Sequence, residues 1–216
     1  MQRIRQHYSL LPPVIKFLLV SNSLIFILEG MFPNLLLGLF ALWPVHMPVV
    51  PPHGVPVQPF YPWQLISYGF LHGSLGHLFL NMYALWLFGV GLENMWGSRR
   101  FAIYYLVCVV GAAITQLVVI DIGGEYYPTI GASGGVFGVL LAFGLFFPNQ
   151  ILILLIPPIP IKAKWFVLIY GVVELVFGIT GTEAGVAHFA HLGGMLFGFM
   201  LIYYWTVEPP PPSPGN

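Results

Sequence analysis

Charged residues are scarce in this chain: aspartate, glutamate, lysine and arginine together make up 6% of its 216 residues. A water-soluble domain usually carries about a quarter charged residues. Because 58% of the chain is hydrophobic, it has too little polar surface to cover a globule in water. The scarcity of charge therefore excludes an ordinary soluble domain and indicates an integral membrane protein surrounded by a lipid bilayer.

Disulfides and an excess of charge of either sign are also missing. The single cysteine, Cys108, lies in an apolar run, so the sequence holds no disulfide framework. Seven basic residues balance seven acidic residues. Without a positive excess there is no electrostatic reason to expect nucleic acid as a partner.

What the chain does have is long apolar segments. They cover residues 14–31, 75–92, 101–120, 133–147, 164–180 and 188–206. A membrane-spanning helix needs about 20 apolar residues. The segment 133–147 is shorter, but its glycine-rich start fits a cavity lined by protein. We therefore predict an all-α polytopic membrane protein with six spans in one domain, residues 1–207, followed by a disordered proline-rich tail, residues 208–216.

The basic residues all fall on one side of this arrangement. They are Arg3, Arg5, Lys16, Arg99, Arg100, Lys162 and Lys164. The loops of the other side carry only acids: Asp121, Glu125 and Glu183. Since basic loops stay in the cytoplasm, we predict that both termini are cytoplasmic. The proline- and aromatic-rich segment 32–74 is then outside, and it is apolar enough to lie on or in the outer leaflet.

Polar residues interrupt three of the expected helices. His77 and Asn81 are four residues apart and share a helix face. Ser133 opens the fourth segment, and His191 lies near the start of the last one. At a rise of about 1.5 Å per residue, Ser133 lies roughly 22 Å from the inner end of its helix, and His77 and His191 lie at similar heights. All are therefore expected a short way below the outer surface of the bilayer.

Glycines predict which helices touch. Two small-x-x-x-small patterns are present, Gly134 with Gly138 and Gly194 with Gly198. Such patterns let membrane helices approach closely. Packing these faces together would bring Ser133 within hydrogen-bond reach of His191, and an imidazole can take the proton of an attacking serine. The unpaired N–H groups of a helix start can stabilise an oxyanion, with His77 and Asn81 as further donors.

The strings that carry these residues resemble the signatures of the rhomboid family of intramembrane serine proteases. They are GASG at 131–134, HGSLGHLFLN at 72–81 and HLGGMLFG at 191–198. Gly-x-Ser-Gly alone is a weak signal, but its combination with His-x-x-x-Asn upstream and His-x-x-Gly-x-x-x-Gly downstream is highly specific. The order, the spacing and the six-span layout match too, so the resemblance covers nearly the whole chain.

The resemblance implies an intramembrane serine endopeptidase that cuts transmembrane segments of other membrane proteins near the outer leaflet, through an acyl-enzyme. It implies Ser133 as nucleophile and His191 as general base, in a dyad without an acidic third member. His77 and Asn81 match the family's oxyanion-stabilising residues, and Gly131 matches the glycine two positions before the nucleophile. It implies no metal and no organic cofactor. The compact form is typical of prokaryotic members, which implies a bacterial inner membrane.

Two positions depart from the family pattern. After Pro62, many members have Trp-Arg in the first outer loop where this chain has Trp63 and Gln64. Phe137 stands where some members have a tyrosine that stacks on the catalytic histidine. Phenylalanine can stack in the same way, so we expect little loss there.

Glu174 lies within the expected span 164–180, and Glu93 lies at the inner end of the span 75–92. A charged side chain within a membrane span is energetically unfavourable. We therefore expect Glu174 to be protonated or hydrogen-bonded at the rim of an aqueous cavity. The family's fifth span is thought to move as a gate, which Glu174 would then tune. Glu93 is expected to tie the inner end of its helix to the following loop or to Arg99 or Arg100.

Several residues have a second interpretation. Ser133 can be a helix cap or a packing residue. His77 and Asn81 can be interhelical hydrogen-bond partners. His188 lies one turn before His191 and competes with it as the base.

Two other classes of function remain as alternatives. A non-enzymatic relative that binds transmembrane clients typically lacks the serine or the histidine, and both are present here. A transporter with a metal site would draw on four histidines, namely His72, His77, His188 and His191. We expect no carboxylate or cysteine beside them, and the sequence has no His-Glu-x-x-His motif.

Overall fold

The computed structural model describes residues 8–46, 58–124, 126–153, 158–182 and 187–207. The α-helices in these ranges are α1 (Pro13–Met31), α2 (Pro33–Phe40), α3 (Gln64–Ser67), α4 (Leu75–Trp96), α5 (Ser98–Gly123), α6 (Ser133–Phe146), α7 (Ala163–Thr180) and α8 (His188–Val207). A 3-10 turn, η1 (Tyr68–Phe70), follows α3. Two short strands, β1 (Ile151–Ile153) and β2 (Pro160–Lys162), pair antiparallel between α6 and α7.

Each predicted span coincides with a helix. Five helices in the described ranges are long and apolar enough to cross a membrane, namely α1, α4, α5, α7 and α8. The remaining one, α6, has 14 residues, as the short predicted segment 133–147 suggested. The prediction of an all-α polytopic membrane protein is confirmed. The predicted tail, residues 208–216, lies outside the described residues.

Prolines and a glycine set several helix ends. Pro13 and Pro33 are the first residues of α1 and α2, where a backbone N–H would have no intrahelical partner anyway. Gly97 follows α4 with a φ of +80°, a conformation that side chains disfavour, and α5 begins at the next residue. The glycine therefore allows a tight turn between two long helices.

Glu93 joins three helices where α4 ends. Its carboxylate accepts hydrogen bonds from the backbone N–H groups of Val14 and Ile15, in the first turn of α1, and from the hydroxyl of Ser98, at the start of α5. The expected contact with the following loop is present at Ser98. The contact with α1 is additional, and it satisfies N–H groups that have no acceptor within their own helix.

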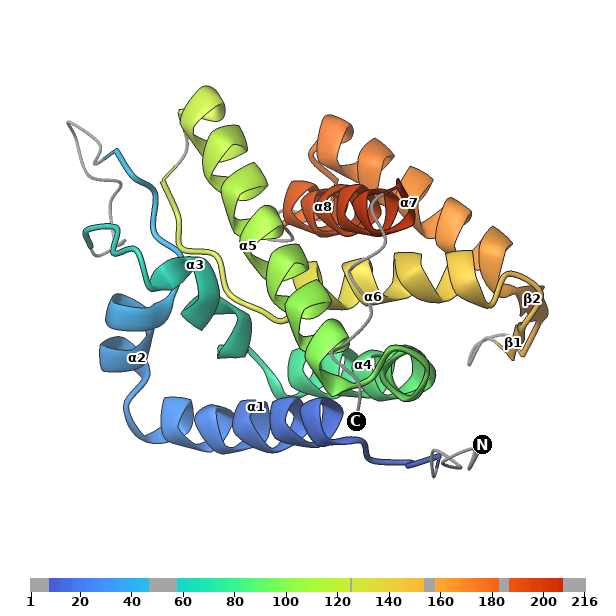
Figure 1. The fold of residues 1–216 in the computed structure, drawn as a ribbon. Coiled ribbons are helices and arrows are strands. Elements are labelled where there is room, and N and C mark those ends of the chain that lie inside the picture. The colour runs from blue at the N-terminus through green and yellow to red at the C-terminus, as the bar shows by residue number, and fades with distance from the viewer. Residues whose placement is uncertain (1–7, 47–57, 125, 154–157, 183–186, 208–216) are drawn as a thin grey trace.

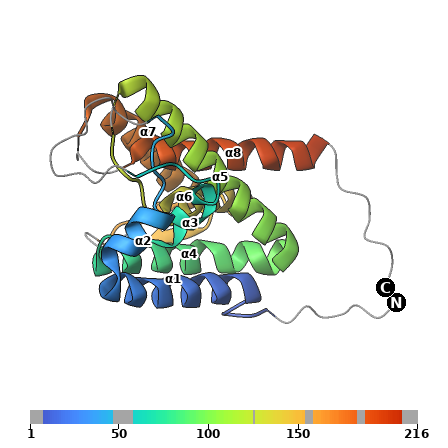
Figure 2. The ribbon, with the colours of Figure 1, turned by 90° about the vertical axis from the view of Figure 1, so that its left-hand side faces the viewer.

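The short helix α6 lies at the centre of the bundle. It packs against α4, α5, α7 and α8, and Figure 1 shows it between α4 and α8. Nine of its 14 residues are buried, whereas α7 buries three of 18, which are Ala163, Val167 and Glu174. α1 lies alongside α4 (Figure 2). The helix that begins with Ser133 is thus shielded by its neighbours, so it does not need the length of a lipid-exposed span.

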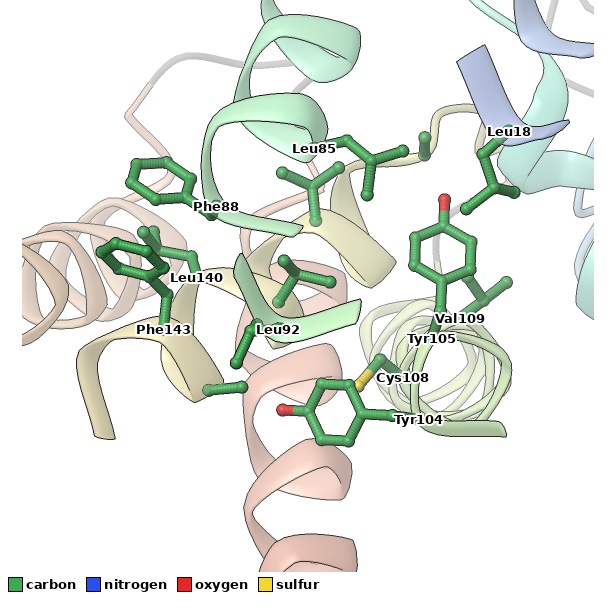
Figure 3. Close-up of a cluster of buried hydrophobic side chains, with 14 of the residues drawn as sticks. Leu18, Leu85, Phe88, Leu92, Tyr104, Tyr105, Cys108, Val109, Leu140 and Phe143 are labelled. Atoms are coloured by element: carbon green, nitrogen blue, oxygen red, sulfur yellow. The ribbon is translucent and has the colours of Figure 1, made fainter. Parts of the chain in front are cut away.

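Apolar side chains from α4, α5 and α6 interlock in the core (Figure 3). The rings of Phe88 and Phe143 meet edge to face, with centroids 5.2 Å apart. The hydroxyl of Tyr104, on α5, donates a 2.7 Å hydrogen bond to the carbonyl oxygen of Gly138, on α6. Close packing of this kind holds helices together in lipid, where the hydrophobic effect contributes little between them.

The helices α6 and α8 approach each other at glycines. A methyl group on Gly194 would overlap the carbonyl oxygen of Gly134, and one on Gly138 would lie 3.0 Å from the carbonyl oxygen of Gly194. Gly198, one turn later, instead faces the ring of Tyr104 on α5. Glycines therefore bring the backbone of α8 against that of α6 at the level where α6 begins.

The outer segment between α1 and α4 is held together by Gln64, one of the two positions that depart from the pattern described above. This side chain is fully buried. Its Oε1 accepts hydrogen bonds from the backbone N–H groups of Trp43 (3.3 Å) and Tyr61 (3.2 Å), and its Nε2 donates to the carbonyl oxygen of Leu39 (3.3 Å). An amide with both a donor and an acceptor thus joins α2, the chain after it and the start of α3. Residues 47–57 of the predicted segment lie outside the described residues.

Replacing Gln64 by Leu is expected to destabilise this outer segment by about 2 kcal/mol or more. Leucine keeps the volume but leaves the N–H groups of Trp43 and Tyr61 unpaired, and each buried unpaired group costs about 1–3 kcal/mol. The carbonyl oxygen of Leu39 still accepts a hydrogen bond from the indole N–H of Trp63. Thermal unfolding in lipid vesicles measures the effect. The matched control is Gln150→Leu, at an exposed glutamine, which should leave the midpoint unchanged. Equal midpoints for the two variants would contradict this role of Gln64.

Candidate active site

The approach to Ser133 is built from backbone and requires a glycine. Gly131 has a φ of +128°, and its N–H donates a 2.9 Å hydrogen bond to the carbonyl oxygen of Tyr68. A methyl group on Gly131 would lie 2.8 Å from the ring of His77. Both the conformation and the space exclude a side chain here. The chain can therefore turn into α6 directly beside the imidazole of His77.

Ser133 and His191 meet where α6 and α8 approach. Nε2 of His191 lies 2.8 Å from Oγ of Ser133, within hydrogen-bond distance. The ring of Phe137, one turn along α6, stacks on His191 with centroids 4.2 Å apart and planes inclined by 3°. The stacking expected of this phenylalanine is thus present, and it fixes the plane of the imidazole.

A carboxylate holds the other side of the same imidazole. Oε2 of Glu174, on α7, lies 2.8 Å from Nδ1 of His191 and 2.7 Å from Nδ1 of His188. Nε2 of His188 lies 3.0 Å from the carbonyl oxygen of Thr182. The resemblance implied no acidic neighbour for the histidine, so the contact between Glu174 and His191 is new information from the structure. One signal was available, because a carboxylate within a span must find polar partners.

The competing base, His188, is turned away from the serine. Its two ring nitrogens contact Glu174 and Thr182, and the imidazole within hydrogen-bond distance of Ser133 is that of His191. His188 is well placed to hold Glu174.

His77 and Asn81 line the same cavity as Ser133 and His191. The ring of His77 lies over Gly131, two residues before the serine. The amide nitrogen of Asn81 donates a 2.9 Å hydrogen bond to the carbonyl oxygen of His77. An amide nitrogen has two hydrogens, so one remains for a group in the cavity. The structure therefore brings together the four polar residues singled out in the sequence.

The cavity has a volume of about 1020 Å³ and lies between α4 and α7. Apart from the polar residues its walls are apolar, and they include Leu87, Phe88, Leu140, Phe166 and Ile169. Pockets for small ligands usually measure about 300–1,000 Å³. The space is therefore large enough for several residues of an extended, apolar peptide.

His72 lies beside this site without joining it. It precedes α4 and is buried, and its ring centroid is 5.0 Å from that of His77. Neither ring nitrogen has a hydrogen-bond partner in the described part of the chain. Burial, and after it the neighbouring His77, lowers the pKa of His72 to about 4. The ring is therefore uncharged near neutral pH.

One group of side chains in the described ranges has the composition of a metal site. The donor atoms of Glu174, His188 and His191 all lie within 4.8 Å of one another. The expectation that no carboxylate accompanies these histidines is therefore wrong. However, ligands of a tetrahedral zinc ion lie about 3.3 Å apart, whereas the nitrogen–oxygen distances of 2.7 and 2.8 Å are those of hydrogen bonds. A cation would have to displace the shared proton and spread these side chains.

Together, the fold and the site define a polytopic membrane protein with a serine–imidazole pair facing an apolar cavity among its helices. Residues 59–207 match the Rhomboid domain. Since this match covers more than half of the chain, the protein belongs to the rhomboid family.

Named relatives come from several kinds of organism. The chain is 32% identical over 149 residues to "Rhomboid protein 1, mitochondrial" of Saccharomyces cerevisiae, covering 67% of this chain and 41% of that protein. It is 33% identical over 136 residues to "Presenilin-associated rhomboid-like protein, mitochondrial" of Rattus norvegicus, covering 62% and 36%. It is 32% identical over 138 residues to "Rhomboid protease GluP" of Bacillus subtilis, covering 63% and 25%.

The aligned regions cover less than half the length of each of these relatives. Two of the three are named mitochondrial and one is bacterial. The protein is an integral membrane protein, but these relatives do not support the expected bacterial inner membrane over another membrane.

Proposed function

We propose that this chain is a serine endopeptidase that cleaves transmembrane segments of other membrane proteins. The observation that carries the proposal is the 2.8 Å contact between Ser133 Oγ and His191 Nε2. A serine is a weak nucleophile unless a base accepts its proton. A buried imidazole held at hydrogen-bond distance by stacking and by a carboxylate is such a base.

The reaction begins when Oγ of Ser133 attacks the carbonyl carbon of the scissile peptide bond. Nε2 of His191 takes the hydroxyl proton and then delivers it to the leaving amine as the carbon–nitrogen bond breaks. The product is an ester between the acyl part of the substrate and Ser133. A water molecule, activated by the same imidazole, hydrolyses the ester and restores the serine.

The oxyanion of the tetrahedral intermediate forms at the start of α6. The first N–H groups of a helix have no intrahelical acceptor and carry the positive end of the helix dipole. His77 and Asn81 line the cavity on its α4 side and supply side-chain donors. Donors fixed in advance stabilise a developing charge without reorganisation, and one such donor contributes about 10²–10³ in rate.

The substrate is a membrane-spanning segment that unwinds near its cut site. A helix protects its amides by internal hydrogen bonds, so small or helix-destabilising residues beside the scissile bond favour cleavage. The apolar walls between α4 and α7 suit the side chains of such a segment.

Cleavage takes place toward the outer leaflet in this proposal. Basic residues lie at the starts of α1, α5 and α7, as Lys16, Arg99, Arg100 and Lys164. If these starts face the cytoplasm, Ser133 at the start of α6 lies toward the opposite face.

A cleavage assay with the purified chain in lipid vesicles tests the proposal. A labelled single-span reporter with small residues near its outer end is expected to be cut in that region, with the position read by mass spectrometry. Because no step uses a metal ion, the rate should be the same with and without EDTA, and a fluorophosphonate should block it by labelling Ser133. Activity that is lost in EDTA, restored by Zn²⁺ and insensitive to fluorophosphonate would instead assign the chemistry to a metal.

A further inference from the structure

We propose that Glu174 is a positioning residue for the reaction, which orients the imidazole of His191 through Nδ1 and is itself held by His188. The inference rests on the proposed function and extends it, because a dyad needs no such residue. The carboxylate of Glu174, on α7, thus orients the base His191, on α8.

The contacts of Glu174 converge on one atom. Its Oε2 lies within 2.8 Å of Nδ1 of both His188 and His191. The two histidines are three residues apart on α8, so they project from the same face of that helix. All three side chains are buried. Low exposure makes these hydrogen bonds strong and makes the loss of one partner costly.

The positions of the protons follow from the acceptors. The carbonyl oxygen of Thr182 can only accept, so the nearby Nε2 of His188 carries a hydrogen. A second proton then lies between Nδ1 of His188 and Oε2 of Glu174, because neither atom could otherwise donate to the other. Wherever this proton resides, the pair is neutral overall. A neutral pair is tolerated within a membrane, where an isolated charge is not.

The remaining contact fixes the tautomer of His191. Its Nδ1 hydrogen points at Oε2 of Glu174, so its Nε2 keeps a free lone pair facing Oγ of Ser133. This is the form that accepts the serine proton. When it does so, the new positive charge lies beside the carboxylate oxygen. Glu174 therefore stabilises both the orientation of the base and its charged form.

Glu174 also links the base to the position of α7. The other two buried residues of α7, Ala163 and Val167, lie in its first two turns. Beyond them Glu174 is the buried residue that reaches α8. A displacement of α7 away from α8 would break the contact with His191, so Glu174 orients the base only while α7 is docked.

The test compares the rate at which a fluorophosphonate labels Ser133 with the final labelled fraction, in the wild type and in Glu174→Gln. The final fraction reports how much protein is folded, and the rate constant reports how well the folded site reacts. Glutamine keeps the size but removes the negative charge. We expect a rate constant lower by about 100-fold or more, with an unchanged final fraction.

Two further variants separate positioning from structure. Glu174→Asp restores the carboxylate on a shorter side chain and should recover part of the rate, which should remain about tenfold below that of the wild type. Glu93→Gln removes a buried, hydrogen-bonded carboxylate far from the site. It should lower the thermal midpoint without changing the rate constant. With the reporter substrate, Glu174→Gln should lower kcat and leave KM nearly unchanged.

The following results would overturn the proposal. A wild-type rate constant in Glu174→Gln, or a lower final fraction with an unchanged rate constant, would overturn the positioning role. If Glu174→Gln does not fold, the same rate constant in Glu174→Asp as in wild type would overturn it. If the wild type is not labelled, the proposed function fails, and the inference fails with it.

Discussion

Replacing Ser133 by Ala is expected to lower the cleavage rate by about 10⁴-fold or more and to abolish labelling by a fluorophosphonate. Alanine removes the oxygen that forms the bond to the substrate, while the packing around it changes little because α6 begins in the same backbone conformation. His191→Ala should reduce cleavage by a similar factor. Initial rates in lipid vesicles, with the reporter in excess, measure both effects.

A variant that combines Ser133→Ala with His191→Ala tests whether the two residues act together. If Ser133 and His191 act as one unit, removing both should reduce the rate no further than removing either alone. His188→Ala is the matched control, since it deletes an imidazole on the same helix that does not contact the serine. It should lose about tenfold in rate through its effect on Glu174. Cleavage by Ser133→Ala at the wild-type rate would rule out the serine mechanism.

The helices of this fold could be predicted from the sequence because the signal is long and local. An apolar run of about 20 residues with polar ends admits few other structures. The predicted segment 164–180 corresponds to the helix Ala163–Thr180, and the predicted segment 188–206 corresponds to the helix His188–Val207. The convergence of His77, Ser133 and His191 also followed, because their motifs fixed the helices and the glycines indicated the contact between two of them.

The partner of Glu174 could not be predicted in the same way. Its contacts join α7 to α8, and they depend on where these two helices contact each other along their lengths. Apolar periodicity does not fix that register. Gln64 is a similar case, because its three backbone partners come from two separate parts of the outer segment. Gly198 faces α5 for a related reason: a small-x-x-x-small pattern indicates a close contact but not which helix makes it.

Replacing Gly194 by Ala is expected to destabilise the protein by about 3 kcal/mol or more. The added methyl group meets the carbonyl oxygen of Gly134, and a backbone atom cannot turn aside as a flexible side chain can. The two helices must therefore separate. Thermal unfolding in lipid vesicles measures the loss. Gly30→Ala is the control, because no atom lies within 4 Å of the new methyl group on α1, and its midpoint should not fall.

The same substitution should also slow the chemistry in molecules that remain folded. Ser133 is the neighbour of Gly134, and His191 lies one turn before Gly194, so a wider separation of α6 and α8 lengthens the 2.8 Å contact between serine and imidazole. A displacement of about 1 Å between reacting groups can cost about 10²-fold in rate. We therefore expect Gly194→Ala to lower the fluorophosphonate labelling rate constant as well as the labelled fraction. A normal rate constant with a reduced fraction would show that the glycine contact stabilises the fold without setting the geometry of the serine–histidine pair.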